Sequence, residues 1–385
     1  MLPKKLLHLL GALVLILWAC QPGCQTQWTC DNLWPVEQDK KWGYIDKNGR
    51  LVIPFKFDGA GGFSEGLAAV EINERTGYID KTGKLVIPPR FYRGYPFSEG
   101  LAVVVIHRSG QIEPPPRYHY GYIDKSGQVV IQPPQDPETL EWFNMAHKAL
   151  AFSEGRACMV HGKMGYIDKT GQQIIPPRYK DVRPFSEGLA AVMKFEDKYG
   201  EDKYGYIDRS GKKVIPFGLM FAGPFSEGLA AAHINYDDHD YVDKTGMLAI
   251  DGKNLVLTRR FSEGLAAVMG KNYKYGYIDR SGKFVIQPQF DRVGDFSEEL
   301  AAVMPVYDAP WPGNLAYINR RGEIVIKSMS ASPDNPVKVE FDLDGYRFYG
   351  GIARVSLGKK EDPDAMGYIN NEGKFIWPKT SKSKK

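Results

Sequence analysis

A seven-residue motif, Gly-Tyr-Ile-Asp-Lys/Arg-x-Gly, recurs along the chain and constrains the fold more than any other feature. The copies closest to the consensus begin at Gly43, Gly77, Gly121, Gly165, Gly205 and Gly276. Degenerate copies occupy residues 240–246, 316–322 and 367–373. Successive tyrosines of the motif are 34 to 51 residues apart. Such a period is typical of a protein that reuses one supersecondary unit with loops of variable length.

A second motif, Phe-Ser-Glu-Gly-Leu-Ala, lies between the copies of the first. It begins at Phe63, Phe97, Phe152, Phe185, Phe225, Phe261 and Phe296, with a degenerate copy at Phe348. Within one unit, the β-branched and apolar residues predict strands at 67–70, 77–80 and 84–87. The Asp-Lys-Thr-Gly sequence between the last two strands is typical of a hairpin, because Asp caps the turn and Gly accepts positive φ. Pro88 and Pro89 then end the third strand.

These repeats predict an all-β protein, and the 41 Gly, 26 Pro and 22 Tyr agree with many short strands separated by turns. A three-stranded antiparallel meander cannot bury both of its faces alone, so neighbouring units must stack. We expect an open, curved β-array of such meanders. The alternative is a closed, propeller-like ring, which is disfavoured because a propeller blade has four strands and only three are evident in each unit.

The repeats resemble the WG repeat family, also described as KWG repeats. Its consensus is a Trp-Gly pair followed by Tyr-Ile-Asp and a Val-Ile-Pro strand, and the sequence from Lys41 to Asp46 matches it. The likeness covers residues 40–378. Only the first copy keeps the tryptophan, at Trp42, and the others have Thr76, Tyr120, Met164, Tyr204 and Tyr275. The resemblance implies a bacterial repeat protein and supports the fold more than any particular function.

The N-terminus is typical of an exported lipoprotein. Lys4 and Lys5 precede an apolar run that is short for a membrane span, so residues 1–19 are predicted to be a signal peptide. The sequence Leu17-Trp18-Ala19-Cys20 resembles a bacterial lipoprotein cleavage box, although Trp18 stands where a small residue is usual. Cys20 is the predicted lipidation site, which gives a membrane-anchored extracytoplasmic protein. Plain secretion is the alternative.

The remaining segments are assigned from composition and spacing. Residues 20–39 are predicted to be a tether, in which Cys24 and Cys30 are candidates for a disulfide because exported proteins retain such bonds. Residues 132–151 are predicted to be a short helical insertion, 327–345 an irregular loop and 379–385 a disordered basic tail. Cys158 aligns with alanines of other units, which predicts a small buried residue.

Charge and motifs exclude several classes of function. The 50 Lys and Arg residues alternate with 46 Asp and Glu residues, so no basic footprint for nucleic acid is evident. The chain has no nucleophile elbow, phosphate loop or dinucleotide fingerprint, and no cofactor is predicted. Asp237, Asp238, His239 and Asp240, with His233 nearby, form the densest group of metal-ligand side chains. A solvated loop explains that group more simply, and no metal site is predicted.

Repeated glutamates could suggest a glycosidase, but repetition argues against catalysis. The candidates are Glu65, Glu99, Glu154, Glu187, Glu227, Glu263 and Glu298. Catalysis requires one pair of carboxylates in unlike surroundings, whereas a repeat gives its members equivalent surroundings. We therefore predict a structural role, such as accepting backbone amides. The aspartates of the first motif are predicted to be turn residues.

The tyrosines of the first motif are the predicted ligand-contact surface. They alternate with isoleucines, so if isoleucine faces the core, the tyrosines form a ladder on the other side. The ladder would consist of Tyr44, Tyr78, Tyr122, Tyr166, Tyr206 and Tyr277. We expect a non-catalytic scaffold that binds a protein, peptide or envelope glycan. The alternative is an envelope-acting hydrolase with its site in one irregular repeat. The sequence does not indicate the oligomeric state.

Overall fold

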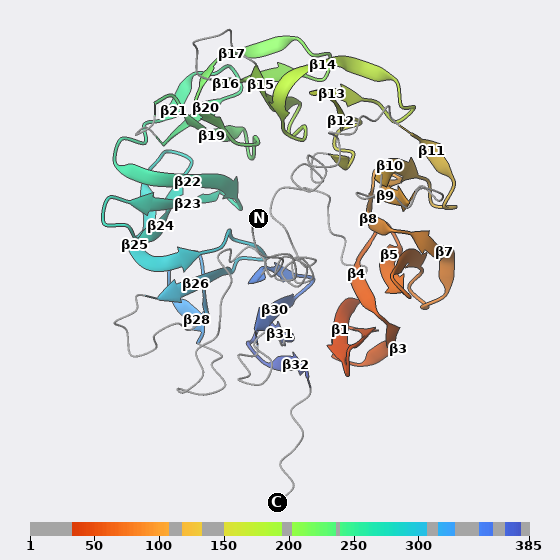
Figure 1. Cartoon of the computed structure of the whole chain (residues 1–385). Helices are drawn as coiled ribbons and strands as arrows, with labels where there is room; N and C mark the ends of the chain where they lie inside the picture. The colour runs from red at the N-terminus through yellow and green to blue at the C-terminus, as the bar shows by residue number, and fades with distance from the viewer. Residues whose placement is uncertain are drawn as a thin grey trace, which may run out of the picture.

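The computed structural model describes residues 33–107, 118–132, 150–194, 202–235, 239–305, 315–327, 346–356 and 366–378. In these residues the regular structure is almost entirely β-strand, and the strands form antiparallel sheets of three to seven strands placed around a ring (Figure 1). The predicted all-β class and the tandem antiparallel meanders are confirmed. Each repeated unit is called a blade here, and the blades are numbered in chain order.

Blades 1 to 9 follow one another without crossing. Blade 1 contains β1 (Trp34–Gln38), β2 (Lys41–Ile45) and β3 (Leu51–Phe57). Because β1 pairs with β2, the end of the predicted tether at residues 20–39 belongs to the array instead. Blade 2 contains β4 (Gly59–Ser64), β5 (Leu67–Ile72), β6 (Arg75–Ile79) and β7 (Leu85–Phe91). Blade 3 contains β8 (Arg93–Ser98), β9 (Leu101–His107), β10 (Tyr118–Ile123) and β11 (Val129–Ile131). Blade 4 contains β12 (Ala157–His161), β13 (Lys163–Ile167) and the start of β14 (Gln173–Val182).

The remaining blades repeat this order. Blade 5 contains the end of β14, β15 (Leu189–Lys194), β16 (Lys203–Asp208) and β17 (Lys213–Leu219). Blade 6 contains β18 (Phe221–Ala222), β19 (Leu229–His233), β20 (Asp240–Asp243) and β21 (Leu248–Ile250). Blade 7 contains β22 (Leu255–Ser262), β23 (Leu265–Gly270), β24 (Tyr275–Asp279) and the start of β25 (Phe284–Val293). Blade 8 contains the end of β25, β26 (Ala301–Pro305), β27 (Ala316–Ile318) and β28 (Ile324–Ile326). Blade 9 contains β29 (Phe348–Tyr349), β30 (Ile352–Ser356), β31 (Met366–Asn370) and β32 (Phe375–Trp377).

The three strands predicted for each unit are present, and in blade 2 they are β5, β6 and β7. The predicted end of the third strand is wrong, because β7 continues through Pro88 and Pro89 to Phe91 at the outer edge of the sheet, where a missing N–H is tolerated. The turn between β6 and β7 has the predicted chemistry: the Asp80 carboxylate accepts the N–H groups of Thr82 and Lys84, at 2.9 and 3.1 Å. Gly83 has a φ of 81°. The hydrogen bond from the Thr82 hydroxyl is the main cause that holds the pKa of Asp80 below its usual range. The aspartate is therefore a turn residue, as predicted.

The structure adds a fourth strand to the meander. In blade 2 this strand is β4, which pairs with β5 through Gly59↔Glu71, Ala60↔Val70 and Ser64↔Leu67. It follows directly on the last strand of blade 1 and lies on the central side of the sheet (Figure 1).

In two places a single strand is both the last strand of one blade and the first strand of the next. β14 and β25 begin at the outer edge of one blade and end at the central edge of the next, which merges neighbouring blades into sheets of six and seven strands.

The core lies between blades, because both faces of an internal blade are covered. Tyr78 packs with Phe97 and Val104 of blade 3, whereas the adjacent Ile79 packs with Tyr44 and other residues of blade 1. The alternation of side chains along a strand thus sends tyrosine to the following blade and isoleucine to the preceding one. Stacking of the blades therefore buries both apolar faces of a meander, which a single meander could not bury alone.

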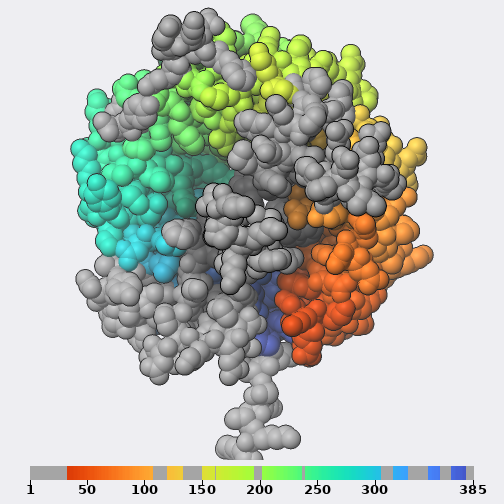
Figure 2. All heavy atoms as spheres, in the orientation of Figure 1, coloured from red at the N-terminus to blue at the C-terminus, as the bar shows by residue number. Residues whose placement is uncertain are grey.

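The array closes into a ring, which is the alternative arrangement considered from the sequence. Tyr368 of blade 9 donates a hydrogen bond to the carbonyl of Pro35 in blade 1, at 2.8 Å. Trp34 and Val36 share a buried cluster with Tyr368, and Phe55 lies 5.8 Å from Trp377 between ring centroids. The red and orange blades at the start and the blue blade at the end are neighbours around the ring (Figures 1 and 2).

Several predictions from the sequence fall outside the described residues. These are the signal peptide, Cys20 and the pair Cys24 and Cys30, as well as nearly all of the helical insertion, the irregular loop and the basic tail. Cys158 is described, and it is a free, fully buried thiol as predicted. Within the described ranges, no helix has the length and apolar character needed to span a membrane.

Candidate binding surface

The ring has two different faces, because successive strands of a blade run in opposite directions. The Phe-Ser-Glu-Gly turns and the Asp-Lys-x-Gly turns lie at one end of the strands, and this side is called the turn face. The hairpins that join the second and third strands of a blade lie at the other end, together with the links between blades. This side is called the hairpin face, and the turn Asn73–Glu74 of blade 2 is an example.

Serines of the turn face join each blade to the next. Ser64 donates to the carbonyl of Phe97, Ser98 to Phe152, Ser153 to Phe185, Ser186 to Phe225, Ser226 to Phe261, Ser262 to Phe296 and Ser297 to Phe348, all at 2.7 to 2.8 Å. The serine and phenylalanine of successive copies of one motif therefore bond to one another. The second sequence motif is a junction between blades.

The neighbouring glutamates make a second set of bonds across the same junctions. Their carboxylates accept backbone N–H groups of the next copy of the motif: Glu65 from Gly100, Glu99 from Gly155, Glu154 from Gly188, Glu187 from Gly228 and Glu227 from Gly264, at 2.9 to 3.0 Å. Glu263 accepts the amides of Glu298 and Glu299, and Glu298 accepts those of Gly350 and Gly351. The predicted role of these glutamates as acceptors of backbone amides is confirmed.

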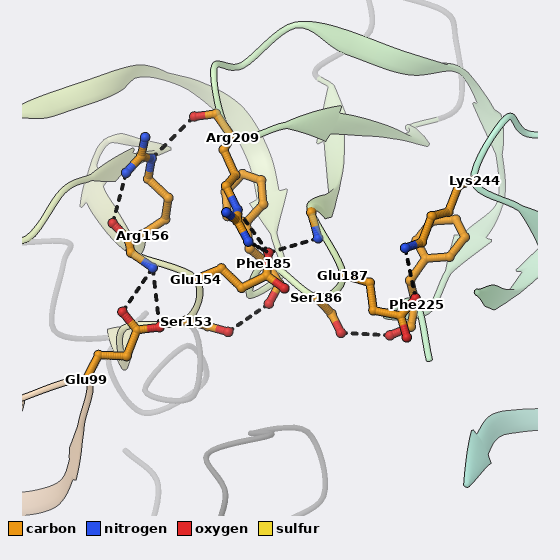
Figure 3. A network of polar contacts seen from close by, with 12 residues as sticks. Glu99, Ser153, Glu154, Arg156, Phe185, Ser186, Glu187, Arg209, Phe225 and Lys244 are labelled. Carbon is orange, nitrogen blue, oxygen red and sulfur yellow. Dashed lines mark hydrogen bonds and ion pairs between the residues drawn. The ribbon is translucent and has the colours of Figure 1, made fainter. Parts of the chain in front are cut away.

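A cation of the next blade completes several of these contacts. Arg209 lies 2.7 Å from Glu154 and Lys244 lies 3.1 Å from Glu187 (Figure 3). Lys169 makes the same kind of contact with Glu99, at 3.0 Å. Burial opposes ionisation of Glu187, but bonds from Lys244 and Gly228 outweigh it and hold its pKa below the usual range. Glu154, Glu187 and Arg209 also line a shallow depression. The same contact thus recurs at three junctions and gives these three glutamates similar surroundings.

The predicted tyrosine ladder is wrong as a ligand-contact surface. Tyr44, Tyr78, Tyr122, Tyr166, Tyr206 and Tyr277 are at most 1% exposed. Each hydroxyl donates to a carbonyl of the following blade, as Tyr44 does to Gly61 at 2.8 Å and Tyr277 to Gly294 at 2.7 Å. Burial raises the pKa of Tyr44 well above its usual range. The prediction failed because the following blade covers the sheet face that was expected to meet solvent.

Several exposed aromatic and aliphatic side chains lie on the hairpin face, whereas others lie along the last strands of the blades and in the turns. Tyr273 is 71% exposed in the hairpin between β23 and β24, and Tyr92 is 43% exposed in the link between blades 2 and 3. Phe221 and Ile234 of blade 6 are exposed to a similar degree as Tyr92. Side chains of this kind, on loops held by a rigid scaffold, are typical of binding surfaces.

Tyr273 is the most unusual of these residues. Its φ is 57°, a left-handed conformation that is uncommon for bulky residues, and it is the only aromatic residue with positive φ among those described. Its N–H bonds to the carbonyl of Gly270 within the hairpin. Sequence reasoning missed this residue because it belongs to neither repeated motif. The available signal was a tyrosine in the polar loop Lys271-Asn272-Tyr273-Lys274, where blade 2 has Asn73-Glu74.

The group of metal-ligand side chains noted in the sequence is only partly assembled. His233 and His239 lie in contact, whereas the Asp240 carboxylate turns away to accept the N–H of Gly252 at 2.7 Å. Asp237 and Asp238 lie outside the described residues. In the part of the chain that the structure describes, no three His, Cys, Asp or Glu side chains gather as a metal site.

Comparison with solved structures supports the architecture. A structure described as the eukaryotic initiation factor is 12% identical, covers 89% of this chain and 94% of its own, and has a TM-score of 0.59. BamB from Moraxella catarrhalis is 10% identical with coverages of 88% and 93% and a TM-score of 0.37. The WD40 β-propeller domain of Doa1 is 10% identical with coverages of 71% and 86% and a TM-score of 0.28. At these identities the likeness concerns the fold alone.

The repeats were also compared with family models and with curated proteins. No curated protein matches the chain. The family model described as WG containing repeat matches residues 42–75, 77–112, 120–133, 164–199, 204–236 and 275–304. These matches begin in blade 1 and end in blade 8, and they include both repeated motifs. The chain therefore belongs to the family of WG-containing repeat proteins.

Proposed function

We propose that this protein is a non-catalytic, extracytoplasmic scaffold, anchored to a membrane, whose hairpin face binds a protein, peptide or envelope glycan. The observation that carries the proposal is Tyr273, an exposed aromatic residue held in a left-handed conformation on a rigid hairpin. Strain of this kind persists where the surrounding structure imposes it, and it clusters at functional sites. A flat ring with a polar tip suits contact with a sugar or with an extended peptide.

The contrast between the two faces supports the same proposal. On the turn face, the glutamates and serines are engaged in bonds between blades. On the hairpin face, the connections vary from the tight turn Asn73–Glu74 to the longer segment between β9 and β10. Repeat proteins usually bind their partners through loops that vary from one repeat to the next on a constant scaffold. A scaffold role is favoured over the hydrolase because the repeated carboxylates have equivalent surroundings.

Replacing Tyr273 by Gly should abolish partner capture while making the protein more stable. Glycine relieves the left-handed conformation, which should raise the free energy of unfolding by about 1 kcal/mol. The measurement is a pull-down from intact envelopes, with the portion from Asp31 onward as bait, together with chemical denaturation of both proteins. We expect the variant to recover at least tenfold less of the captured partner.

Met247→Ala is the matched control for this experiment. Met247 is 71% exposed, like Tyr273, but it lies in a turn of the turn face. Its replacement should leave capture unchanged. Equal capture by the Tyr273→Gly variant and the original protein would contradict binding at the hairpin face, as would loss of capture in the Met247→Ala variant alone.

The membrane anchor is a separate part of the proposal and rests on Cys20. Diacylation at Cys20 would supply several acyl chains, and each buried methylene contributes about 0.8 kcal/mol to membrane attachment. Cys20→Ser should therefore move the protein from the membrane fraction to the soluble fraction and remove the mass of the lipid. Cys158→Ser is the control, because that thiol is buried in the ring. Membrane retention and mass that are the same before and after Cys20→Ser would refute the anchor.

A further inference from the structure

Two imidazoles meet at the hairpin of blade 6. His233 is the last residue of β19, and His239 immediately precedes β20. The distance between His239 Nδ1 and His233 Nε2 is 3.0 Å. The ring centroids are 4.3 Å apart and the rings are inclined by 76°. One nitrogen of each ring thus faces the other ring on the hairpin face, at hydrogen-bond distance.

The backbone around both histidines is fixed by pairing and by packing. Phe221 pairs with His233 between β18 and β19, and the N–H of Met220 donates to the His233 carbonyl at 2.7 Å. On the other side of the hairpin, a Cβ at Gly252 would lie only 1.9 Å from the His239 carbonyl oxygen. The chain therefore passes His239 at a distance that only glycine permits. The two imidazoles project from positions that are set before any ligand arrives.

Packing limits how the His233 ring can turn. The neutral imidazole is the form that coordinates metals. The Phe221 ring, 4.8 Å from the His233 ring between centroids, limits the orientations open to that imidazole.

We propose that His233 Nε2 and His239 Nδ1 bind one divalent transition-metal ion of the copper, nickel or zinc type. Two nitrogens that each lie about 2.1 Å from one ion at a right angle are about 3.0 Å apart. The observed separation of 3.0 Å matches that geometry. The ion replaces the hydrogen bond between the rings, and the proton of that bond moves to the other nitrogen of its ring. Within the described residues, no third His, Cys, Asp or Glu side chain gathers with this pair.

Metal titration of the full chain tests this site directly. The protein is purified with a tag that lacks histidine, and Cu²⁺, Ni²⁺ and Zn²⁺ are added separately at pH 7.5 while heat is measured by calorimetry. We expect one ion per chain at this site. The electron paramagnetic resonance spectrum of the Cu²⁺ form should show coupling to two imidazole nitrogens. Absence of binding by all three ions, or coupling to a single nitrogen, would overturn the proposal.

Two conservative variants keep the test independent of folding. His239→Asn and His233→Gln retain a side chain that can bond to the remaining imidazole but is a poor metal ligand. Each should weaken binding at least tenfold while the far-ultraviolet circular dichroism stays unchanged. His147→Ala removes a histidine from another part of the sequence and should leave the affinity unchanged. Affinity that is unaltered in either pair variant would place the ion elsewhere and refute the site.

Discussion

Replacing Gly83 by Val is expected to lower the free energy of unfolding by about 4 kcal/mol, through backbone strain together with overpacking. Gly83 has a φ of 81°, and a Cβ on it would lie 2.8 Å from Cγ2 of Ile53 in the preceding blade. Ile53 is fully buried, and close packing in a core leaves a side chain little room to move. Chemical denaturation followed by circular dichroism measures the effect.

Gly100→Val separates the two causes. Gly100 has a φ of 88°, but no atom lies within 4 Å of a Cβ built on it. Its replacement should therefore cost only the strain, about 1 to 3 kcal/mol. Similar losses for the two variants would show that the Asp-Lys-x-Gly turn does not press against the neighbouring blade, contrary to the packing described above.

Replacing Tyr368 by Ala should cost about 3 to 5 kcal/mol, the range for removing a large aromatic side chain from a core. Tyr368 is 6% exposed, and its hydroxyl donates to Pro35 across the junction between blades 9 and 1. In an open array the same side chain would lie on an end surface, where its loss would have little effect. Denaturation followed by tryptophan fluorescence is a suitable measurement, because Trp34 and Trp377 belong to the same cluster.

Tyr277→Ala supplies the internal reference for that experiment. Tyr277 makes the corresponding bond between blades 7 and 8, where its hydroxyl donates to Gly294. A closed ring predicts a large loss at both positions, since each tyrosine is then buried against the next blade. A loss at Tyr368 that is much smaller than the loss at Tyr277 would indicate that the ends of the array are open in solution.

The sequence predicts the local structure of the blades well, because turns and strands depend mainly on residues that are close together in the sequence. Asp80 and Gly83 define a turn whatever surrounds them, and alternating apolar residues define the strands on either side. The role of the glutamates follows from repetition alone. Cys158 could be placed in the core because its equivalents in other units are alanines.

The fourth strand and the closure could not be predicted, because both depend on contacts between blades. The β4 sequence Gly-Ala-Gly-Gly-Phe-Ser has little intrinsic preference for a strand, and it becomes one by pairing with β5. Closure depends on a small rotation from each blade to the next, which no single repeat encodes visibly. The tyrosine ladder was misplaced for the same reason, since alternation gives two faces of a strand but does not say what covers them.

Candidate residues on the hairpin face were hard to find because they lie outside the repeated pattern. Tyr273 is exceptional only through its backbone conformation, which the sequence does not reveal. His233 and His239 were visible as neighbours in the sequence, but a separation of six residues sets no distance between their rings. The hairpin of blade 6 determines that distance.

Closure of the ring has a consequence for how the chain is made. The bond between Tyr368 and Pro35 joins residues 333 positions apart, so it forms only after blade 9 has been synthesised. Until then, the apolar surface of blade 1 around Trp34, Val36 and Ile45 has no partner, and exposed surfaces of this kind promote aggregation. The newly made first blade is therefore vulnerable to aggregation until blade 9 docks against it.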